Sequence, residues 1–318
     1  MKRLLSVLAV TLAFPVFAQT YPNKPIKIVV PYPAGGNADN FARTLAQKLN
    51  EPYGQPLIID NRPGATGTIG GALVAKSPPD GYTLVEHTAS SYIAAYLYRG
   101  VTYDPAKAYA PVINCANLAF ALVAASNQPV KTVADLVALA REQPNKITYS
   151  SQGAGSAGHL VSEMFNTVAG IRTVHVPYKG SAPAMIALAS GEVHFGFNNI
   201  LDPQPFVKAG KMRALAVTSG KRSAAMPGVP TMIESGISGF EVSFWLGVLA
   251  PAGTPKAVVN KLNADITRIL EMPKMKEWLL RDVGGEFTAN TPEQFTDFLV
   301  TDTARWIKVA RDNDVRFD

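Results

Sequence analysis

The fold class of this chain is indicated first by Ile26-Lys27-Ile28-Val29-Val30-Pro31-Tyr32-Pro33-Ala34-Gly35-Gly36-Asn37-Ala38-Asp39. A β-branched run leads into a glycine-rich turn, and the apolar spacing that follows is typical of a helix. The same order recurs at residues 147–165, where Ile-Thr-Tyr-Ser-Ser precedes Gln-Gly-Ala-Gly-Ser-Ala-Gly. Two units of strand, glycine turn and helix predict an α/β fold with largely parallel sheets.

Each glycine-rich turn also indicates a binding function. A turn between a strand and a helix presents backbone N–H groups at the positive end of the helix dipole, which favours an anion. One such turn is compatible with a nucleotide site. Two of them, one in each half of the chain, predict a cleft that holds a carboxylate from both sides. Glycines that only cap helices and permit tight turns are the alternative.

Strands and helices alternate along the rest of the chain. β-branched and apolar runs predict further strands at 56–60, 82–87, 117–126, 173–177, 193–197, 214–218 and 241–250. Amphipathic spacing and capping residues predict helices at 39–50, 68–75, 132–144, 158–168, 184–190, 256–270, 273–281 and 292–313.

Two of these strands, 117–126 and 241–250, are long and apolar, and they flank the second unit. They are predicted to form a hinge that leaves the first unit and returns to it. The expected organisation is one discontinuous lobe of residues 19–122 plus 242–318 and a second lobe of residues 123–241. A ligand would lie between the lobes, at the carboxyl ends of the strands.

The N-terminus has the features of an export signal. Lys2 and Arg3 precede an apolar run at residues 4–14, and Val16-Phe17-Ala18 suits a signal peptidase. The apolar run is too short to span a bilayer. We therefore expect residues 1–18 to be a signal peptide that is cut after Ala18, giving a periplasmic protein. The next residue is Gln19 and not cysteine, which argues against a lipid anchor.

Composition and charge exclude several classes of protein. With 318 residues and 47% hydrophobic content, the chain can bury a large core in two domains. Its formal charge of +6 falls to +4 without Lys2 and Arg3, and no basic cluster suggests nucleic acid. Cys115 has no partner for an internal disulfide, and the four histidines are scattered without close-spaced acidic residues. We expect no metal and no cofactor.

Two enzymatic interpretations of the second turn fail on the surrounding sequence. Residues 153–158 fit the dinucleotide pattern G-x-G-x-x-G, yet the next predicted strand ends at Tyr178-Lys179 where an acidic residue is needed. A hydrolase with Ser156 as nucleophile needs an acid and then a histidine. Only Glu163 and Glu192 precede the later histidines, and residues 195–318 contain no histidine. A secreted serine hydrolase is therefore the weaker alternative to a binding protein.

Motifs along the whole mature chain resemble the Bug-type extracytoplasmic receptors of the tripartite tricarboxylate transporter system, the family also called TctC-like. They are Tyr-Pro-x-Lys-Pro-Ile at 21–26, Pro-Ala-Gly-Gly-x-x-Asp at 33–39, Asn-Arg-Pro-Gly-Ala at 61–65, Gly-Ser-Ala-Gly-His-Leu at 155–160, Val-Pro-Tyr-Lys-Gly at 176–180, Lys-Ala-Gly-Lys-Met-Arg-Ala-Leu-Ala-Val-Thr at 208–218 and Leu-Ala-Pro-Ala-Gly-Thr-Pro at 249–255.

The resemblance implies a two-lobed periplasmic-binding-protein fold, type II-like, that closes on a ligand and has no enzymatic activity. The ligand would be a small organic mono- or dicarboxylate, with aromatic acids and acidic amino acids included. The partners would be the membrane permease subunits of a tripartite transporter, with no nucleic acid, and the receptor would be a monomer. A sensor that hands its ligand-bound state to a signalling protein would have the same sequence features.

The family's two loops act as pincers whose backbone amides hold one carboxylate. Carried onto this sequence, they are residues 33–36 and 151–157, and the Ser156 hydroxyl and the Gly155–Ala157 amides are the strongest candidates. Asp39 is expected to cap its helix. The ligand-binding residues that the resemblance implies are Tyr32, Pro33, Ala34, Gly35, Gly36, Thr88, Ala89, Ser90, Ser151, Gln152, Gly153, Gly155, Ser156, Ala157, Tyr178, Asn198, Asn199 and Asp202.

Four side chains keep two interpretations each. The Tyr32 phenol either donates a hydrogen bond to the ligand or forms part of the wall. His159 packs in the core or touches the ligand. Lys179 either neutralises a carboxylate of the ligand or has only a structural role in the turn where it lies. Trp245 lies in the core or stacks on the ligand. The identity of the carboxylate does not follow from the sequence, because backbone amides would bind it and these are the same in every residue type except proline.

Overall fold

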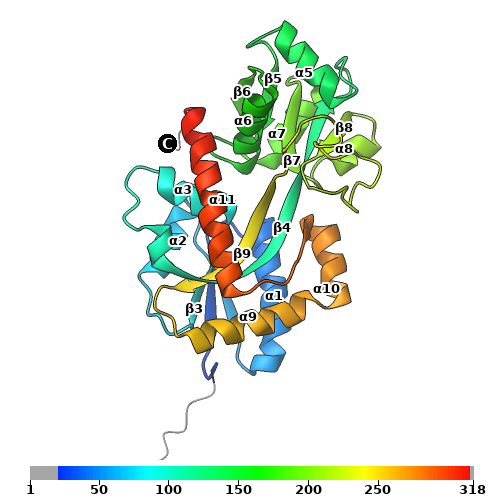
Figure 1. Cartoon of the computed structure of the whole chain (residues 1–318). Helices are drawn as coiled ribbons and strands as arrows, with labels where there is room; N and C mark the ends of the chain where they lie inside the picture. Colours follow the sequence, from blue (N-terminus) through cyan, green and yellow to red (C-terminus); the bar gives the residue numbers. More distant parts are fainter. Residues whose placement is uncertain (1–20, 316–318) are drawn as a thin grey trace, which may run out of the picture.

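The structure is a computed structural model that describes residues 21–315 (Figure 1). The predicted signal peptide, residues 1–18, lies outside the described residues. Within residues 21–315, the helices are all too short or too polar to cross a membrane.

The strands form one curled sheet in which parallel and antiparallel pairs are segregated. In order across the sheet they run β2-β1-β3-β9-β4-β7-β5-β6, and β8 and β10 also pair with β4. Their bounds are β1 Ile26–Val30, β2 Leu57–Asn61, β3 Thr83–Thr88, β4 Tyr109–Ala125, β5 Thr148–Ser151, β6 Val174–Pro177, β7 Phe195–Asn199, β8 Met212–Val217, β9 Ser243–Pro251 and β10 Gly285–Glu286.

Helices cover this sheet on its outer sides. Their bounds are α1 Asn37–Tyr53, α2 Thr68–Ala75, α3 Ala89–Leu97, α4 Pro105–Ala108, α5 Val133–Glu142, α6 Ala157–Ala169, α7 Ser181–Ser190, α8 Gln204–Lys208, α9 Lys256–Leu270, α10 Pro273–Trp278 and α11 Pro292–Asp312. A 3₁₀ turn at Ala65–Gly67 precedes α2, and a π-helical turn at Leu279–Val283 follows α10.

Two groups of parallel strands are joined by two antiparallel strands. Strand β1 pairs in parallel with β2 and β3, and β5 pairs in parallel with β6 and β7. Strands β4 and β9 lie between these groups and run antiparallel to each other. The first part of β4 pairs with β9, and its last residues, from Phe120 onwards, pair with β7 and β8. The sequence prediction of two long connecting strands is thereby confirmed.

The two groups form the two lobes of a periplasmic-binding-protein fold, as the sequence predicts. In Figure 1, β1–β3 with α1–α3 and α9 occupy the lower half, and β5–β8 with α5–α8 occupy the upper half. Helix α11 reaches from one half to the other and packs against β4, α3 and α6. The residue boundaries of the lobes, 19–122 plus 242–318 and 123–241, stay a prediction.

Local chemistry explains where the main helices begin and end. Thr132 and Asp135 form a capping box at α5, with the Thr132 Oγ1 accepting from the Asp135 N–H at 3.1 Å. Thr291 and Gln294 form the same box at α11. Helix α1 ends at Gly54, whose φ of 61° places it in the left-handed conformation that glycine adopts most readily.

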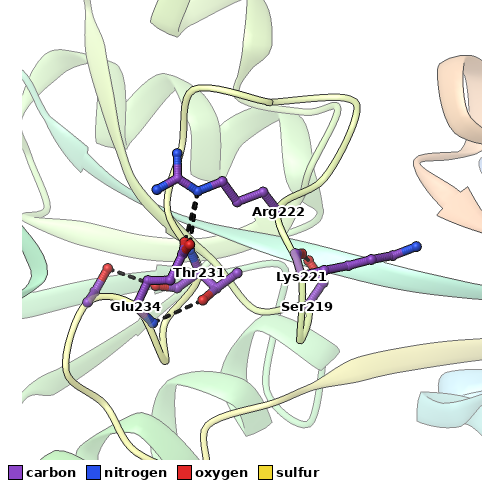
Figure 2. A network of polar contacts seen from close by, with 6 residues as sticks. Ser219, Lys221, Arg222, Thr231 and Glu234 are labelled. Atoms are coloured by element: carbon purple, nitrogen blue, oxygen red, sulfur yellow. Dashed lines mark hydrogen bonds and ion pairs between the residues drawn. The ribbon is translucent and has the colours of Figure 1, made fainter.

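The segment between β8 and β9 has little regular structure and is held by polar contacts (Figure 2). The Glu234 carboxylate accepts from the Arg222 Nε at 2.9 Å and from the Thr231 N–H at 2.7 Å. Lys221 points away from this network and pairs with Glu286 of β10 at 3.1 Å. This segment is therefore tied to β10, which itself pairs with β4.

Candidate functional site

The candidate site is a pocket of about 580 Å³ at the carboxyl ends of β1, β3, β5, β6 and β7. Open α/β sheets bind their ligands at this edge. Its walls come from both halves of the molecule and from the two connecting strands. The lining residues are Tyr32, Pro33, Gly36, Asn37, Ala38, Thr66, Thr88, Ser90, Leu118, Phe120, Gln152, Ser156, Ala157, Gly180, Ser181, Asn199, Phe244 and Trp245.

Four helices begin at this pocket. The capping residues Gly36 of α1, Thr88 of α3, Ser156 of α6 and Gly180 of α7 all belong to its lining. Each helix start carries a partial positive charge and N–H groups without partners inside the helix. Among the described residues that form the lining there is no lysine, arginine, histidine, aspartate or glutamate. The groups of the lining that favour an anion are therefore the backbone N–H groups at the helix starts and not cationic side chains.

Asp39 holds the first loop in shape. It is 2% exposed, and its Oδ2 accepts from the Gly35 N–H at 2.8 Å and from the Arg43 Nε at 2.9 Å. Its Oδ1 accepts from the Asn61 Nδ2 at 2.9 Å. The Arg43 hydrogen bond, together with the other donors, lowers the pKa of Asp39 to about 2. The carboxylate is therefore fully engaged behind the loop. This arrangement lets Gly35 keep a φ of 85°.

Backbone donors remain available at the starts of α1 and α6. In the described part of the chain, no acceptor engages the N–H groups of Gly36, Asn37 and Ala38 at α1. At α6 the Ala157 N–H is likewise left over within residues 21–315. These donors belong to residues that line the pocket. An anionic oxygen placed there would satisfy them and interact favourably with both dipoles.

Several backbone amides of the second loop are used in hydrogen bonds within the loop and its helix. The Gly155 N–H donates to the His159 Nδ1 at 3.0 Å, and the Ser156 N–H donates to the Gly153 carbonyl at 3.2 Å. The Ser156 Oγ caps α6 by accepting from the His159 N–H at 3.4 Å. Of the three amides that the sequence favours, at Gly155 to Ala157, only the Ala157 N–H has no acceptor among the described residues.

Two histidines lie behind this loop. Their rings stack with centroids 3.7 Å apart, and the His175 Nε2 hydrogen-bonds the Ser151 Oγ at 2.6 Å. Burial lowers the pKa of His159 to about 3 and that of His175 to about 4. His159 is outside the pocket lining and 8% exposed, so in this structure it packs in the interior and positions Gly155.

This histidine pair predicts that acid lowers the stability of the folded protein. An unfolded histidine takes up a proton near pH 6.5, and the folded His159 and His175 do so only near pH 3 to 4. Stability should therefore fall as the pH drops from about 6.5 to 4, by about 1.4 kcal/mol per pH unit for each histidine. Urea unfolding at pH 7 and pH 4.5 measures this. In His159→Asn, whose Oδ1 can still accept from Gly155, the pH dependence should flatten; an unchanged slope would contradict the assignment.

The start of α3 forms the third side of the pocket. The Tyr32 hydroxyl hydrogen-bonds the Thr88 Oγ1 at 2.5 Å, and Thr88 and Ser91 form a capping box. Burial raises the pKa of Tyr32, so the phenol stays protonated at neutral pH. In the described residues the Ser90 hydroxyl has no protein partner. Tyr32 thus contributes to the wall, and its hydroxyl pair with Thr88 retains one proton that can face a ligand.

The remaining wall is apolar and comes from the two connecting strands. Leu118 and Phe120 of β4 and Phe244 and Trp245 of β9 line the pocket. Leu118 pairs directly with Phe244 in the β4–β9 register. Trp245 is 1% exposed and also packs edge-on against Phe295 and Tyr92 in the core, so it serves both the core and the pocket wall.

The other face of the same strands borders a separate cavity. Asn117 and Ala119 of β4 line a space of about 610 Å³, together with Ser243 of β9 and the Lys221–Glu286 pair. Neighbouring residues of a strand point to opposite faces. The ligand pocket and this second cavity therefore lie on opposite sides of the connecting strands. We call the second one the rear cavity, and the strand face that borders it the rear face.

The structure brings half of the predicted site residues together at the pocket. Those that line it are Tyr32, Pro33, Gly36, Thr88, Ser90, Gln152, Ser156, Ala157 and Asn199. Those outside its lining are Ala34, Gly35, Ala89, Ser151, Gly153, Gly155, Tyr178, Asn198 and Asp202. Lys179 is exposed and also outside the lining. Whether each residue binds the ligand stays a prediction.

Several residues outside the lining support residues that line it. The Asn198 Oδ1 accepts from the Gln152 Nε2 at 2.7 Å, and Asn198 itself is wholly buried. The Asp202 carboxylate accepts from the Ser181 hydroxyl at 2.5 Å, and burial raises the pKa of Asp202. The Tyr178 hydroxyl instead donates to Glu192 at 2.7 Å.

Sequence reasoning missed part of the lining, namely Asn37, Ala38, Thr66, Leu118, Phe120, Gly180, Ser181 and Phe244. For Gly180 and Ser181 a signal was present, because a glycine turn opens a helix there as it does at the two pincer loops. The apolar wall had no such signal, since it depends on the register of β4 against β9.

The arrangement around Ser156 also bears on the hydrolase alternative. In residues 21–315 no imidazole nitrogen hydrogen-bonds the Ser156 Oγ, which accepts from the backbone N–H of His159. The serine that does contact an imidazole, Ser151, is wholly buried. A nucleophilic serine needs both a base and access to its substrate. Neither residue meets both requirements in this structure.

Comparison of this chain with known proteins identifies its family. The family model described as "Tripartite tricarboxylate transporter family receptor" matches residues 41–314. Protein BugT of Bordetella pertussis is 34% identical, over 98% of this chain and 98% of its own. A solved R. palustris protein with adipate is 38% identical, with a TM-score of 0.81 over 93% of this chain and 99% of that one.

A second solved structure, MatC from Rhodopseudomonas palustris with bound malate, is 29% identical, with a TM-score of 0.77 over 91% of this chain and 99% of that one. The resemblance drawn from the sequence is confirmed. Members of this family are periplasmic receptors of a solute-binding, non-enzymatic class. This chain therefore belongs to the receptor family of the tripartite tricarboxylate transporters, as a Bug-type, TctC-like solute-binding protein.

Proposed function

We propose that this protein is a periplasmic receptor that captures a small organic mono- or dicarboxylate and delivers it to the permease of a tripartite transporter. The observation that supports this most is the convergence of four helix starts on one pocket without a charged side chain. The adipate and malate in the related structures are carboxylates as well. Residues 1–18 would direct export and be removed after Ala18.

The proposed mechanism is closure of the two lobes around the ligand. Unpaired N–H groups at α1 and α6 would hold one carboxylate from opposite sides, so the ligand itself would join the lobes. Each helix dipole contributes about 0.3–1 kcal/mol to an exposed anion and up to about 2 kcal/mol to a partly buried one. Closure would hide the ligand from water and present a new surface to the permease.

Calorimetric titration with a panel of carboxylates tests this function. The purified protein without residues 1–18 would be titrated with aliphatic, aromatic, hydroxylated and amino carboxylates. We expect at least one to bind with a dissociation constant in the micromolar range or below, because solute capture requires it. Ser156→Ala removes the α6 cap and should weaken that binding. If no carboxylate produces heat or raises the melting temperature, the proposal is wrong.

A further inference from the structure

We infer that the ligand is a carboxylate with an unsubstituted hydrocarbon body, aliphatic or aromatic, and not a hydroxy acid or an amino acid. This inference rests on the proposed function and narrows the class of its ligand. It follows from a separation of the pocket lining into two kinds of surface, one with unused donors and one without.

The unused hydrogen-bond donors are gathered at the helix starts. They include the N–H groups of Gly36, Asn37, Ala38 and Ala157. Beside them lie the Asn37 side-chain amide, the hydroxyl groups of Ser90 and Ser156, and the remaining proton of the Tyr32–Thr88 pair. All of these can donate to a carboxylate. In the pocket lining no carboxylate side chain is present that could accept from a ligand ammonium group.

The polar side chains away from the helix starts already have protein partners. Gln152 donates to the Asn198 Oδ1 at 2.7 Å and accepts from the Gly158 N–H at 3.3 Å. Asn199 donates to the Val283 carbonyl at 3.2 Å and accepts from the Leu201 N–H at 3.0 Å. Thr66 is hydrogen-bonded to the Tyr98 hydroxyl at 3.1 Å.

The four side chains that the connecting strands contribute to the lining, Leu118, Phe120, Phe244 and Trp245, offer apolar surface. A hydroxyl or ammonium group on the body of the ligand would lose its water there and gain no partner, which costs free energy. A methylene chain or an aromatic ring would instead gain from contact with these side chains. The pocket therefore selects the body of the ligand by its lack of polar groups.

Matched ligands that differ by one group test the inference. We expect calorimetry to show that hexanoate binds about ten- to a hundredfold more tightly than 6-hydroxyhexanoate and than 6-aminohexanoate, which carry their polar group at the end of the chain opposite the carboxylate. Hydroxy or amino forms that bind equally well or better would overturn the inference and leave the proposed function intact. Binding of no carboxylate at all would overturn the proposed function, and this inference with it.

A variant of the apolar wall tests its cause. Leu118→Asn places an amide on the pocket face of β4, and we expect the preference for hexanoate over 6-hydroxyhexanoate to shrink to a few-fold. Ala119→Ser, on the rear face of the same strand, is the matched control and should keep the wild-type ratio. The ratio of the affinities for the two ligands is insensitive to a general loss of stability. Thermal melting would report such a loss separately. An unchanged ratio in Leu118→Asn would contradict the assignment.

Discussion

Gly158→Ala should weaken ligand binding at least tenfold. A Cβ on Gly158 would lie 2.6 Å from the Phe197 carbonyl oxygen and 2.6 Å from the Gln152 Oε1. Carbon and oxygen cannot approach so closely, so the start of α6 would move away from β7. This shift would break the hydrogen bond from the Gly158 N–H to Gln152. It would also move the free Ala157 N–H, so that this donor and those at the start of α1 could no longer hold the same carboxylate. Overpacking of this kind also costs about 1–3 kcal/mol of stability.

Calorimetry and thermal melting on the same sample separate the two effects of Gly158→Ala. Gly228→Ala is a matched control, because nothing lies within 4 Å of its added Cβ and it is outside the pocket lining. The control should bind and melt like the wild type. Wild-type affinity in a folded Gly158→Ala protein would show that the position of α6 does not govern binding.

Asp39→Asn should lower the free energy of unfolding by about 2 kcal/mol and weaken ligand binding as well. The substitution removes the negative charge that accepts from the Gly35 N–H, the Asn61 amide and Arg43. Asparagine keeps one carbonyl oxygen and turns an NH2 group toward the remaining donors, and a donor left without an acceptor in a buried site typically costs about 1–3 kcal/mol. The first loop would also lose the contact that holds Gly35 in place, so the free N–H groups at α1 would be less well ordered.

The pH dependence of Asp39 has a definite sign. Its folded pKa of about 2 lies below the ordinary value of 3.8, so its contribution is present above about pH 4. The contribution is lost as the pH falls through about 2. Urea unfolding and calorimetry at pH 7 measure the effect of Asp39→Asn. Asp135→Asn, which alters an exposed helix cap far from the pocket, should leave ligand affinity unchanged. If Asp39→Asn binds the ligand as tightly as Asp135→Asn and the wild type, Asp39 does not order the binding loop.

The sequence predicted the elements whose ends carry chemical signals. Strand Ile26–Val30 and helices Thr68–Ala75 and Lys256–Leu270 lie where the patterns place them. Helix α3, Ala89–Leu97, was missed because its apolar residues surround it and its capping box uses serine at the third position. Strand β4 begins at Tyr109 and not near 117, because β9 extends its pairing through irregular residues that include Pro111.

The candidate site divides in the same way. The starts of α1 and α6 could be recognised from glycine and serine next to a strand, and both line the pocket. The hydrogen bond from the Gly155 N–H to the His159 ring could not be recognised from the sequence, because it depends on the rotamer of a buried ring. Asn198 and Asn199 were equivalent in sequence, yet one is wholly buried and the other lines the pocket, since neighbouring strand residues point to opposite faces.

Helix-start amides from the two lobes are proposed to hold the carboxylate. Amide NMR of ¹⁵N-labelled protein, titrated to saturation with the tightest-binding carboxylate, reports on these amides one by one. We expect the largest shift changes at Gly36, Asn37, Ala38 and Ala157, whose N–H groups have no protein acceptor. Unchanged signals from these amides at full saturation would contradict the account.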